Sequence, residues 1–260
     1  MHPELFSIGN FTIHTYGFMI MIGAVLGFIY MSSSVKKELG IEREKIQNLA
    51  ILIIVSAFFG GKLFFFFEDP SYYFGSFANM KKNFRTGFVF YGSLLFAIPI
   101  VIWYFRREKW PVWSMLDRIA IIACIIHGMG RIGCFFAGCC HGVPTDVPWG
   151  VTFTNTSSQA EPLHTPLHPT QLYSAGLIFG ILTILLMFKR HKRFEGQLFF
   201  IYIILYAIGR GIIEIFRGDE ARGYVVDGII SHSQFISIIV ITITVWAYVR
   251  FKRKAKFKKS

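Results

Sequence analysis

Long apolar segments alternate with short polar connectors along the whole chain. The apolar segments cover residues 16–35, 46–67, 87–105, 119–136, 171–188, 197–216 and 229–249. A hydrocarbon core about 30 Å thick needs about 20 predominantly apolar residues in a helix that crosses it. The pattern therefore predicts an all-α integral membrane protein with seven transmembrane helices.

The connectors are too short for a separate soluble domain, so we expect residues 1–260 to form a single polytopic membrane domain. The longest connector, 137–170, contains five prolines and neither lysine nor arginine. We expect it to form a small extracytoplasmic loop domain between the fourth and fifth spans, with short strands around WGVTFT. The composition agrees with a membrane protein, because 53% of the residues are hydrophobic and only 16% are charged.

Lysine and arginine are distributed unevenly between the connectors. Four follow each of the first, third and fifth spans, seven lie in the tail 250–260, and the alternate connectors together hold five. Basic residues are enriched on the cytoplasmic side of membrane proteins. The distribution therefore predicts a cytoplasmic C-terminus and an N-terminus outside. No lysine or arginine precedes the first apolar segment, so we expect no cleaved signal peptide.

The net charge of +12 raises the question of nucleic-acid binding. The basic tail 250–260 follows a membrane span, and Phe251 and Phe257 are its only aromatic residues. A basic segment at the end of a transmembrane helix is typical of contact with anionic lipid headgroups. We therefore expect the lipid bilayer, and no nucleic acid, as a partner of this tail.

An arginine lies at the outer end of the fourth predicted span, in the segment HGMGRIGCFFAGCCHG. Charged side chains within a membrane usually face a cavity or a partner, although snorkelling to the interface is an alternative for Arg131. The glycines around it, Gly130 and Gly142 among them, leave the backbone open to close approach. We interpret this segment as a candidate ligand site at the helix end.

The sixth predicted span ends in GRGIIEIFRGDEARG, where Arg210, Glu214 and Arg217 fall on one helical stripe. Arg210 and Glu214 can form an ion pair whose only role is to reduce the cost of burial. The functional alternative is that Arg210 and Arg131 reach the same outer half of the membrane. Two guanidinium groups there can bind one phosphate through planar forks of donors, and a phospholipid headgroup supplies a phosphate at that depth.

Two other patterns point to weaker hypotheses. GMGRIG matches a dinucleotide-binding fingerprint, but no strand precedes it, so we expect no cofactor. Cys134, Cys139, Cys140 and His141 have the side chains of a metal site. Their adjacent cysteines and apolar setting favour packing of small side chains instead, and we expect no metal.

Taken together, these segments resemble a known family. GRIGCFFAGCCHG is similar to the signature segment of the bacterial prolipoprotein diacylglyceryl transferases. Other segments resemble family motifs in the same order along the chain: IHTYGFM with Tyr16, GGKLFF with Lys62 where the family usually has arginine, LHPTQLY with His168 and Gln171, GRGIIEIFRGDEARG with Arg210 and Glu214, and SHSQFIS with Gln234. The resemblance covers nearly the whole chain.

The resemblance implies a reaction and a location. The family moves the diacylglyceryl group of phosphatidylglycerol to the thiol of the lipobox cysteine in a prolipoprotein, which forms a thioether and releases glycerol phosphate. The implied location is the bacterial plasma (inner) membrane, as a multi-pass protein. Arg131 and Arg210 match the phospholipid-binding and catalytic arginines, which would stabilise the departing phosphate. The other matched functional positions are Tyr16, Gly130, Gly142, Glu214, His168 and Gln171.

The chain departs from the family pattern at two places. The third span of the family usually opens with His-Gly-Gly, whose histidine is the proposed catalytic base, whereas this chain has Tyr91-Gly92-Ser93. Tyrosine, with a pKa of about 10, is a poor base at neutral pH, so Tyr91 has positioning of the headgroup as an alternative role. The second departure is Cys134, where many members carry asparagine, together with the Cys139–Cys140 pair in place of polar residues.

These departures leave two alternatives to the transferase. One is a catalytically impaired paralogue that binds anionic phospholipid without turnover. The other is a transporter of an anionic solute, which is disfavoured because the sequence has no repeated halves with paired broken helices.

Overall fold

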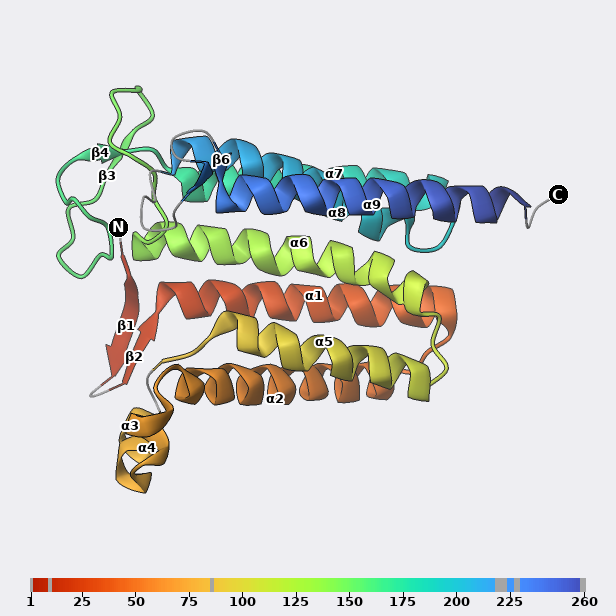
Figure 1. Ribbon diagram of the computed structural model, residues 1–260, viewed down its shortest axis with the longest axis horizontal. Helices are drawn as coiled ribbons and strands as arrows, with labels where there is room; N and C mark the ends of the chain where they lie inside the picture. Colours follow the sequence, from red (N-terminus) through yellow and green to blue (C-terminus); the bar gives the residue numbers. More distant parts are fainter. Residues whose placement is uncertain (1, 9–10, 85–86, 218–223, 227–229, 258–260) are drawn as a thin grey trace. The chain divides into compact units, whose positions relative to one another are not determined.

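The computed structural model describes residues 2–8, 11–84, 87–217, 224–226 and 230–257. The described chain is mostly helical (Figure 1). Its long helices are α1 (Thr15–Leu39), α2 (Arg43–Glu68), α5 (Phe90–Arg107), α6 (Val112–Ala137), α7 (Thr170–Phe188), α8 (Gln197–Ile213) and α9 (His232–Phe257). The short helices are α3 (Pro70–Phe74), α4 (Phe77–Asn83), and the 3-10 turns η1 (Lys189–His191) and η2 (Glu214–Phe216).

Three two-stranded antiparallel ribbons complete the described structure. They are β1 (Glu4–Ile8) with β2 (Phe11–His14), β3 (Val151–Thr152) with β4 (Pro166–Leu167), and β5 (Tyr224–Val226) with β6 (Ile230–Ser231). In the second ribbon Val151 pairs with Leu167, and β3 lies within the WGVTFT segment where a short strand was expected.

Six of the described helices are long and apolar enough to cross a membrane. They correspond to the first, second and fourth to seventh predicted spans, so the all-α membrane class is confirmed. The third predicted span corresponds to α5, which is 18 residues long, contains Pro99 and ends in Arg106 and Arg107. The polar end of this short helix lowers its mean hydropathy, and the count of seven spans stays a prediction.

Two element boundaries differ from the sequence expectation. Ile229, the predicted start of the last span, lies outside the described residues, and α9 begins at His232. This helix continues to Phe257, so most of the tail 250–260 is helical; residues 258–260 are not described. Arg and Lys favour helix and also suit its C-terminal end, where they interact favourably with the helix dipole.

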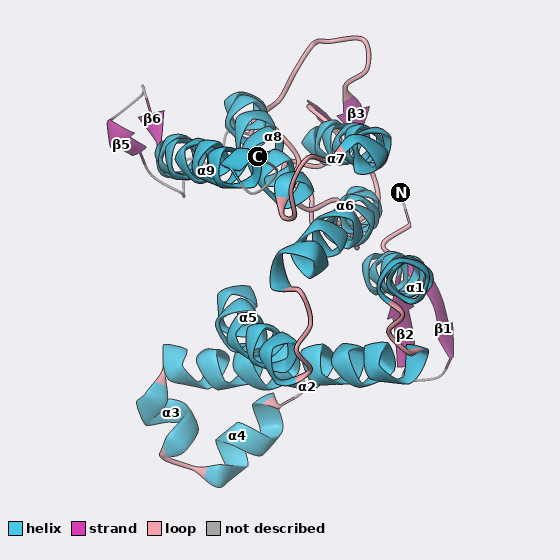
Figure 2. Ribbon diagram, turned by 90° about the vertical axis from the view of Figure 1, so that its right-hand side faces the viewer, coloured by secondary structure: helices cyan, strands magenta, loops and turns pink. Residues whose placement is uncertain are grey.

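The chain forms two compact units, residues 1–31 with 116–260 and residues 32–115. In the first unit, α6, α7 and α8 share a core of seven buried side chains: Ala120, Ile121, Cys124, Ile178, Ile181, Leu185 and Leu198. Figure 2 shows α7, α8 and α9 side by side, close to end-on. The absence of a side chain at Gly209 allows α7 to approach α8, because a Cβ there would overlap Leu177.

The beginning of α1 packs on α6 within the same unit. A Cβ at Gly23 would lie 3.0 Å from the Cα of Ile126, and one at Gly27 would lie 2.9 Å from Ile122. Small residues allow membrane helices to approach closely in this way. The loop 138–169 has its own small core of Phe153, Ala160 and Leu167, against which Phe135 of α6 packs.

In the second unit, α2 and α5 pack against each other through two glycines. A Cβ at Gly60 would overlap the carbonyl oxygen of Gly92, and a Cβ at Gly92 would reach 2.6 Å from Phe64. Lys62 is buried in this unit, and its Nζ donates a hydrogen bond to the carbonyl oxygen of Gly87 at 2.7 Å. The lysine charge is therefore directed at the backbone that precedes α5.

Candidate functional site

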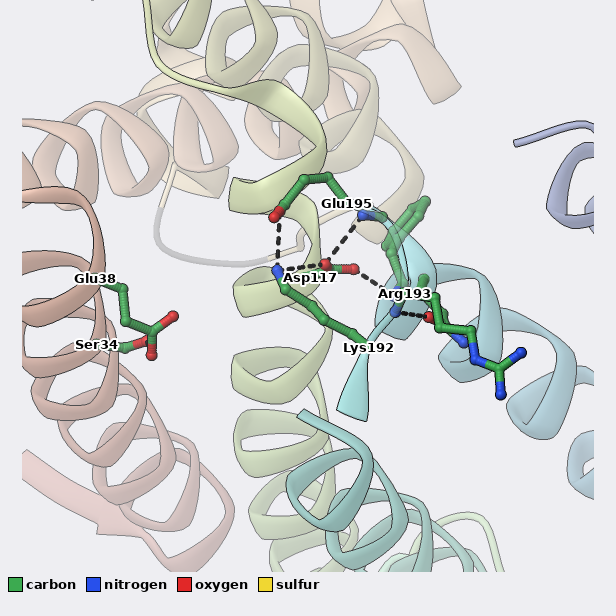
Figure 3. Close-up of polar contacts among 9 residues, drawn as sticks. Ser34, Glu38, Asp117, Lys192, Arg193 and Glu195 are labelled. Carbon is green, nitrogen blue, oxygen red and sulfur yellow. Dashed lines mark hydrogen bonds and ion pairs between the residues drawn. The ribbon is translucent and has the colours of Figure 1, made fainter. Parts of the chain in front are cut away.

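A buried carboxylate fixes the start of α8 against α6. The Oδ2 atom of Asp117, whose residue is 2% exposed, accepts hydrogen bonds from the N–H of Gly196 at 3.0 Å and from the Nζ of Lys192 at 3.3 Å. Its Oδ1 atom accepts from the N–H of Phe199 at 3.1 Å (Figure 3). Helix N-termini leave such N–H groups unsatisfied and favour a negative charge. Asp117 therefore holds the first turn of α8 at a fixed level along α6.

A second contact between the same helices lies further along both. The ring of His127 on α6 lies against the ring of Tyr206 on α8, with centroids 5.4 Å apart. Asp117 and Gly196 are 79 positions apart in the chain, and His127 and Tyr206 keep the same separation. Because both contacts join residues that are 79 positions apart in the sequence, α6 and α8 run in the same direction and keep the same register between the two contacts.

Arg131 and Arg210 have that same separation and lie one helical turn beyond the ring contact. Residues four apart lie on one face of a helix, so Arg131 follows His127 on α6 as Arg210 follows Tyr206 on α8. The Nε of Arg131 donates to the Nε2 of His127 at 3.2 Å, which requires that nitrogen of the imidazole to be unprotonated. The shared register supports a common level for the two guanidinium groups.

The expected ion pair between Arg210 and Glu214 is confirmed. The Nη1 of Arg210 contacts the Oε2 of Glu214, and the two side chains are 17% and 8% exposed. The Nη2 of Arg210 also donates to the Oγ of Ser233 on α9 at 3.4 Å. The carboxylate and the hydroxyl together orient the guanidinium plane.

Arg217 does not continue the single helical stripe that the sequence predicted for Arg210, Glu214 and Arg217. The helix stops at Ile213, and residues 214–216 form the 3-10 turn η2. Arg217 follows this turn, its N–H donates to the carbonyl oxygen of Glu214 at 3.1 Å, and the residue is 4% exposed. The tighter winding of the 3-10 turn, with three residues per turn, removes Arg217 from the α-helical spacing.

Gly142, His168 and Gln171 meet where the loop joins α7. The N–H of Gly142 donates to the carbonyl oxygen of His168 at 2.8 Å, and a Cβ on this glycine would overlap the carbonyl oxygen of Phe216. The His168 ring lies 5.3 Å from the ring of Phe216, and its Nδ1 is 3.1 Å from the hydroxyl of Tyr173. These contacts bind the loop to the end of α8, close to Arg217.

Gln171 holds the cysteine-containing end of α6. Its side chain is fully buried, and its Nε2 donates to the carbonyl oxygen of Cys139 at 2.8 Å. Its neighbour Thr170 donates through Oγ1 to the carbonyl oxygen of Cys140 at 2.7 Å. The LHPTQLY motif thus positions the GCCHG turn through two side-chain hydrogen bonds.

The sulfur atoms of Cys134, Cys139 and Cys140 all lie within 4.8 Å of one another. Hydrogen bonds from the thiols of Cys134 and Cys139, and the guanidinium groups of Arg217 and Arg131, lower the pKa of the Cys140 thiol well below its usual range. The sequence favoured simple packing of these side chains. The structure brings the three thiols into one cluster near Arg131 and Arg217.

Tyr16 on α1 lies near this cluster and against a glycine of α6. The Tyr16 phenol is close enough to the three thiols and to Arg131 to interact with them electrostatically, and the residue is 42% exposed. A Cβ at Gly133 would lie 3.0 Å from the Cα of Tyr16, so this glycine sets the approach of α1. A Cβ at Gly130 would meet only Ile20, at 3.7 Å. Packing among the described residues therefore does not require glycine at position 130.

Tyr91 belongs to the second unit, residues 32–115. It is the second residue of α5, it is 79% exposed, and its ring lies 6.1 Å from that of Phe90. Its hydroxyl group is thus available to a ligand, and its predicted role in catalysis stays a prediction.

Sequence reasoning did not identify Asp117, His127 and Tyr206 as part of the site. A signal for two of them was present, because His127 and Tyr206 each precede an intramembrane arginine by four residues. Asp117 gave no such signal, since its partners Gly196 and Phe199 are about 80 positions away and are backbone groups.

Comparison with known proteins adds to this geometry. The family model described as "Prolipoprotein diacylglyceryl transferase" matches residues 3–250. The chain is 38% identical to the phosphatidylglycerol–prolipoprotein diacylglyceryl transferase of Clostridium tetani, over 95% of this chain and 97% of that protein. It is 32% identical to the phosphatidylglycerol–prolipoprotein diacylglyceryl transferase 2 of Clostridium perfringens, over 93% of this chain and 92% of that protein. It is 31% identical to the transferase of Serratia proteamaculans, over 95% of this chain and 93% of that protein.

Proposed function

The chain belongs to the prolipoprotein diacylglyceryl transferase family, and on that premise we propose how its residues carry out the transfer. The substrates are phosphatidylglycerol and a prolipoprotein with a lipobox cysteine. The cysteine sulfur bonds to the glyceryl carbon that carries the phosphate, the carbon–oxygen bond breaks, and glycerol phosphate leaves with the electron pair. The product is a thioether.

In this proposal Arg131 and Arg210 bind the phosphate of phosphatidylglycerol between α6 and α8. The common register of Asp117–Gly196 and His127–Tyr206 supports the proposal, because Arg131 and Arg210 have the same separation in the chain as these two pairs. A guanidinium offers five N–H donors, and in Arg131 the Nε is the one donor with a hydrogen-bond partner among the described residues. The remaining donors can stabilise the charge that develops on the departing phosphate.

Glu214 and Ser233 orient Arg210, while the positive charge nearby favours the thiolate form of the incoming cysteine. Glu214 offsets one of the positive charges, so that Arg210 can be buried at lower cost. The thiolate is the competent nucleophile of a cysteine. Tyr16, Gly130, Gly142, His168 and Gln171 complete the proposed substrate site, and Tyr91 positions the headgroup or takes part in proton transfer.

We place the protein in the bacterial plasma membrane with the site toward the outside. The distribution of lysine and arginine supports an N-terminus outside, seven spans and a cytoplasmic tail. The loop after α6 contacts the end of α8 through Val143 and Phe216. It would therefore cover the site on the side from which a secreted prolipoprotein arrives.

The test is transfer of a labelled diacylglyceryl group from phosphatidylglycerol to a lipobox peptide in proteoliposomes. Removing one donor that stabilises a transition-state charge costs about 100- to 1000-fold in rate, so Arg131→Ala and Arg210→Ala should each lose at least that much. Arg190→Ala is the matched control, because Arg190 is exposed on the connector after α7. Full transfer by either site variant would contradict the proposal, and binding of phosphatidylglycerol without turnover by the unmodified protein would favour the impaired paralogue.

A further inference from the structure

The cysteine cluster at the end of α6 has a composition and geometry that the transfer reaction does not use. We propose that Cys134, Cys139 and Cys140 form a binding site for one thiophilic cation, with Zn²⁺ as the reference ion. The three thiolates would supply three ligands, and the fourth position would hold water. This proposal is independent of the proposed function.

The spacing of the sulfur atoms suits such an ion. Zinc binds thiolate at about 2.3 Å, and tetrahedral geometry then separates two sulfur atoms by about 3.8 Å. All three sulfur atoms lie within 4.8 Å of one another. The sulfur–sulfur distances therefore need to shorten by at most about 1 Å for the three thiolates to coordinate the ion, and rotation of the side chains can supply this change.

The backbone holds the three residues in place. Cys134 lies in the last turns of α6, and Gly138, with φ +81°, ends that helix through its N–H bond to the carbonyl oxygen of Cys134 at 2.9 Å. Cys140 has φ +62°, in the left-handed region that side chains rarely adopt. Thr170 and Gln171 bond the carbonyl oxygens of Cys140 and Cys139. These hydrogen bonds hold Cys140 in an unfavourable backbone conformation, and such conformations are frequent at functional sites.

Two arginines supply positive charge near the cluster. Three thiolates and one Zn²⁺ carry a net charge of −1, which the guanidinium groups of Arg217 and Arg131 can balance. The thiolate is the form of cysteine that binds metals. Arg217 is 4% exposed, so little solvent screens its charge.

A polar atom beside the cluster supports a ligand there. The Oε1 of the fully buried Gln171 has no hydrogen-bond partner among the described residues, while its Nε2 contacts the Cys139 carbonyl. Buried polar atoms are normally satisfied. A water molecule bound to the ion at its fourth position would donate a hydrogen bond to this Oε1 atom.

Cys124 shows what a cysteine in a simple packing role looks like in this protein. It is fully buried in the apolar core of α6, α7 and α8, together with Ile121 and Ile178, and it belongs to no cluster of metal-ligating side chains among the described residues. The contrast with the three clustered cysteines provides a matched control for the experiment.

The experiment uses the full chain, purified in detergent, reduced, treated with a chelator and freed of both reagents. Titration with Cd²⁺ should produce a thiolate-to-metal charge-transfer band that saturates at one ion per chain, and Zn²⁺ should compete with it. Cys140→Ser and Cys139→Ser should each weaken binding by at least about 10-fold, the effect that even an outer-shell partner carries. Cys124→Ala should bind as the unmodified chain does.

Three results would overturn the proposal. The first is a reduced protein with four titratable thiols and no charge-transfer band. The second is unchanged affinity in both Cys139→Ser and Cys140→Ser. The third is an equal loss in Cys124→Ala, with all variants monodisperse and equally helical by circular dichroism. None of these readouts depends on transfer activity, so a failure here leaves the proposed function intact and the reverse also holds.

Discussion

The carboxylate of Asp117, near the start of α6, accepts a hydrogen bond of 3.0 Å from the N–H of Gly196, immediately before α8. Because these residues have the same separation in the chain as Arg131 and Arg210, this bond sets the register on which the proposed phosphate site depends. The consequence is that a residue about four helical turns from Arg131 should control activity.

Asp117→Ala should lower both stability and transfer. The substitution removes the acceptor for Gly196 and Phe199 at the start of α8, and loss of a helix cap costs about 1–2 kcal/mol. It also leaves Lys192 with Glu195 as its remaining acidic partner. Thermal unfolding in detergent and the transfer assay would measure the two effects.

Asp117→Asn and Asp146→Ala serve as comparisons. The asparagine keeps one acceptor oxygen, so its loss of stability should be smaller than that of the alanine variant. Asp146 is exposed in the loop, and its replacement should change neither quantity. Unfolding of Asp117→Ala at the temperature of the unmodified protein would show that this carboxylate does not fix the helix register.

Two replacements of Glu214 should distinguish the effect of its negative charge from its effect on the orientation of the Arg210 guanidinium. Glu214→Gln keeps a hydrogen-bond acceptor for Arg210 and removes a negative charge, so it should retain more transfer activity than Glu214→Ala, by about 10-fold for a charge-assisted contact worth roughly 1.4 kcal/mol. The KM for phosphatidylglycerol should not rise in the glutamine variant, because the positive charge around the phosphate increases. Equal rates for the two variants would refute an orienting role.

Two glycines of the site should respond differently to alanine. Gly142→Ala places a methyl group against Phe216 and His168, and such overpacking costs about 1–3 kcal/mol. Gly130→Ala has only Ile20 near its new methyl group, at 3.7 Å, so thermal stability should be unchanged. If substrate lies across this backbone, Gly130→Ala should still raise the KM for phosphatidylglycerol. Stability and kinetics measured on both variants would check this, and unchanged KM would exclude Gly130 from the binding site.

The hydroxyl of Tyr91 should matter for transfer and not for stability. Tyr91 is 79% exposed, so Tyr91→Phe should unfold at the same temperature as the unmodified protein. Loss of one hydrogen bond to the substrate predicts a decrease in transfer of about 10-fold. Tyr91→His, which introduces the histidine that the family resemblance implies for this position, should transfer at least as fast as the unmodified chain. Full activity of Tyr91→Phe would remove this residue from the mechanism.

The sequence was sufficient for the helices because each membrane span must satisfy its own backbone hydrogen bonds and be apolar over about 20 residues. The predicted segment 171–188 matches α7 within one residue for this reason. Predictions were weaker where helix ends carry charge, as in α5 with Arg106 and Arg107, and where the backbone changes to a 3-10 turn after Ile213. The sequence also predicted the ion pair of Arg210 and Glu214, since an intramembrane charge needs a partner or a ligand, and the proposed role of Arg131 stays a prediction.

What the sequence alone determined about this protein is therefore local: which segments are helical and apolar, and which of them carry arginine. Its tertiary structure decided the register of α6 and α8, through Asp117 and the backbone of α8, and it brought Cys134 to Cys139 and Cys140. The physical reason is distance along the chain. Helix periodicity links residues three and four apart, whereas a carboxylate that caps a helix 79 positions away leaves no periodic trace.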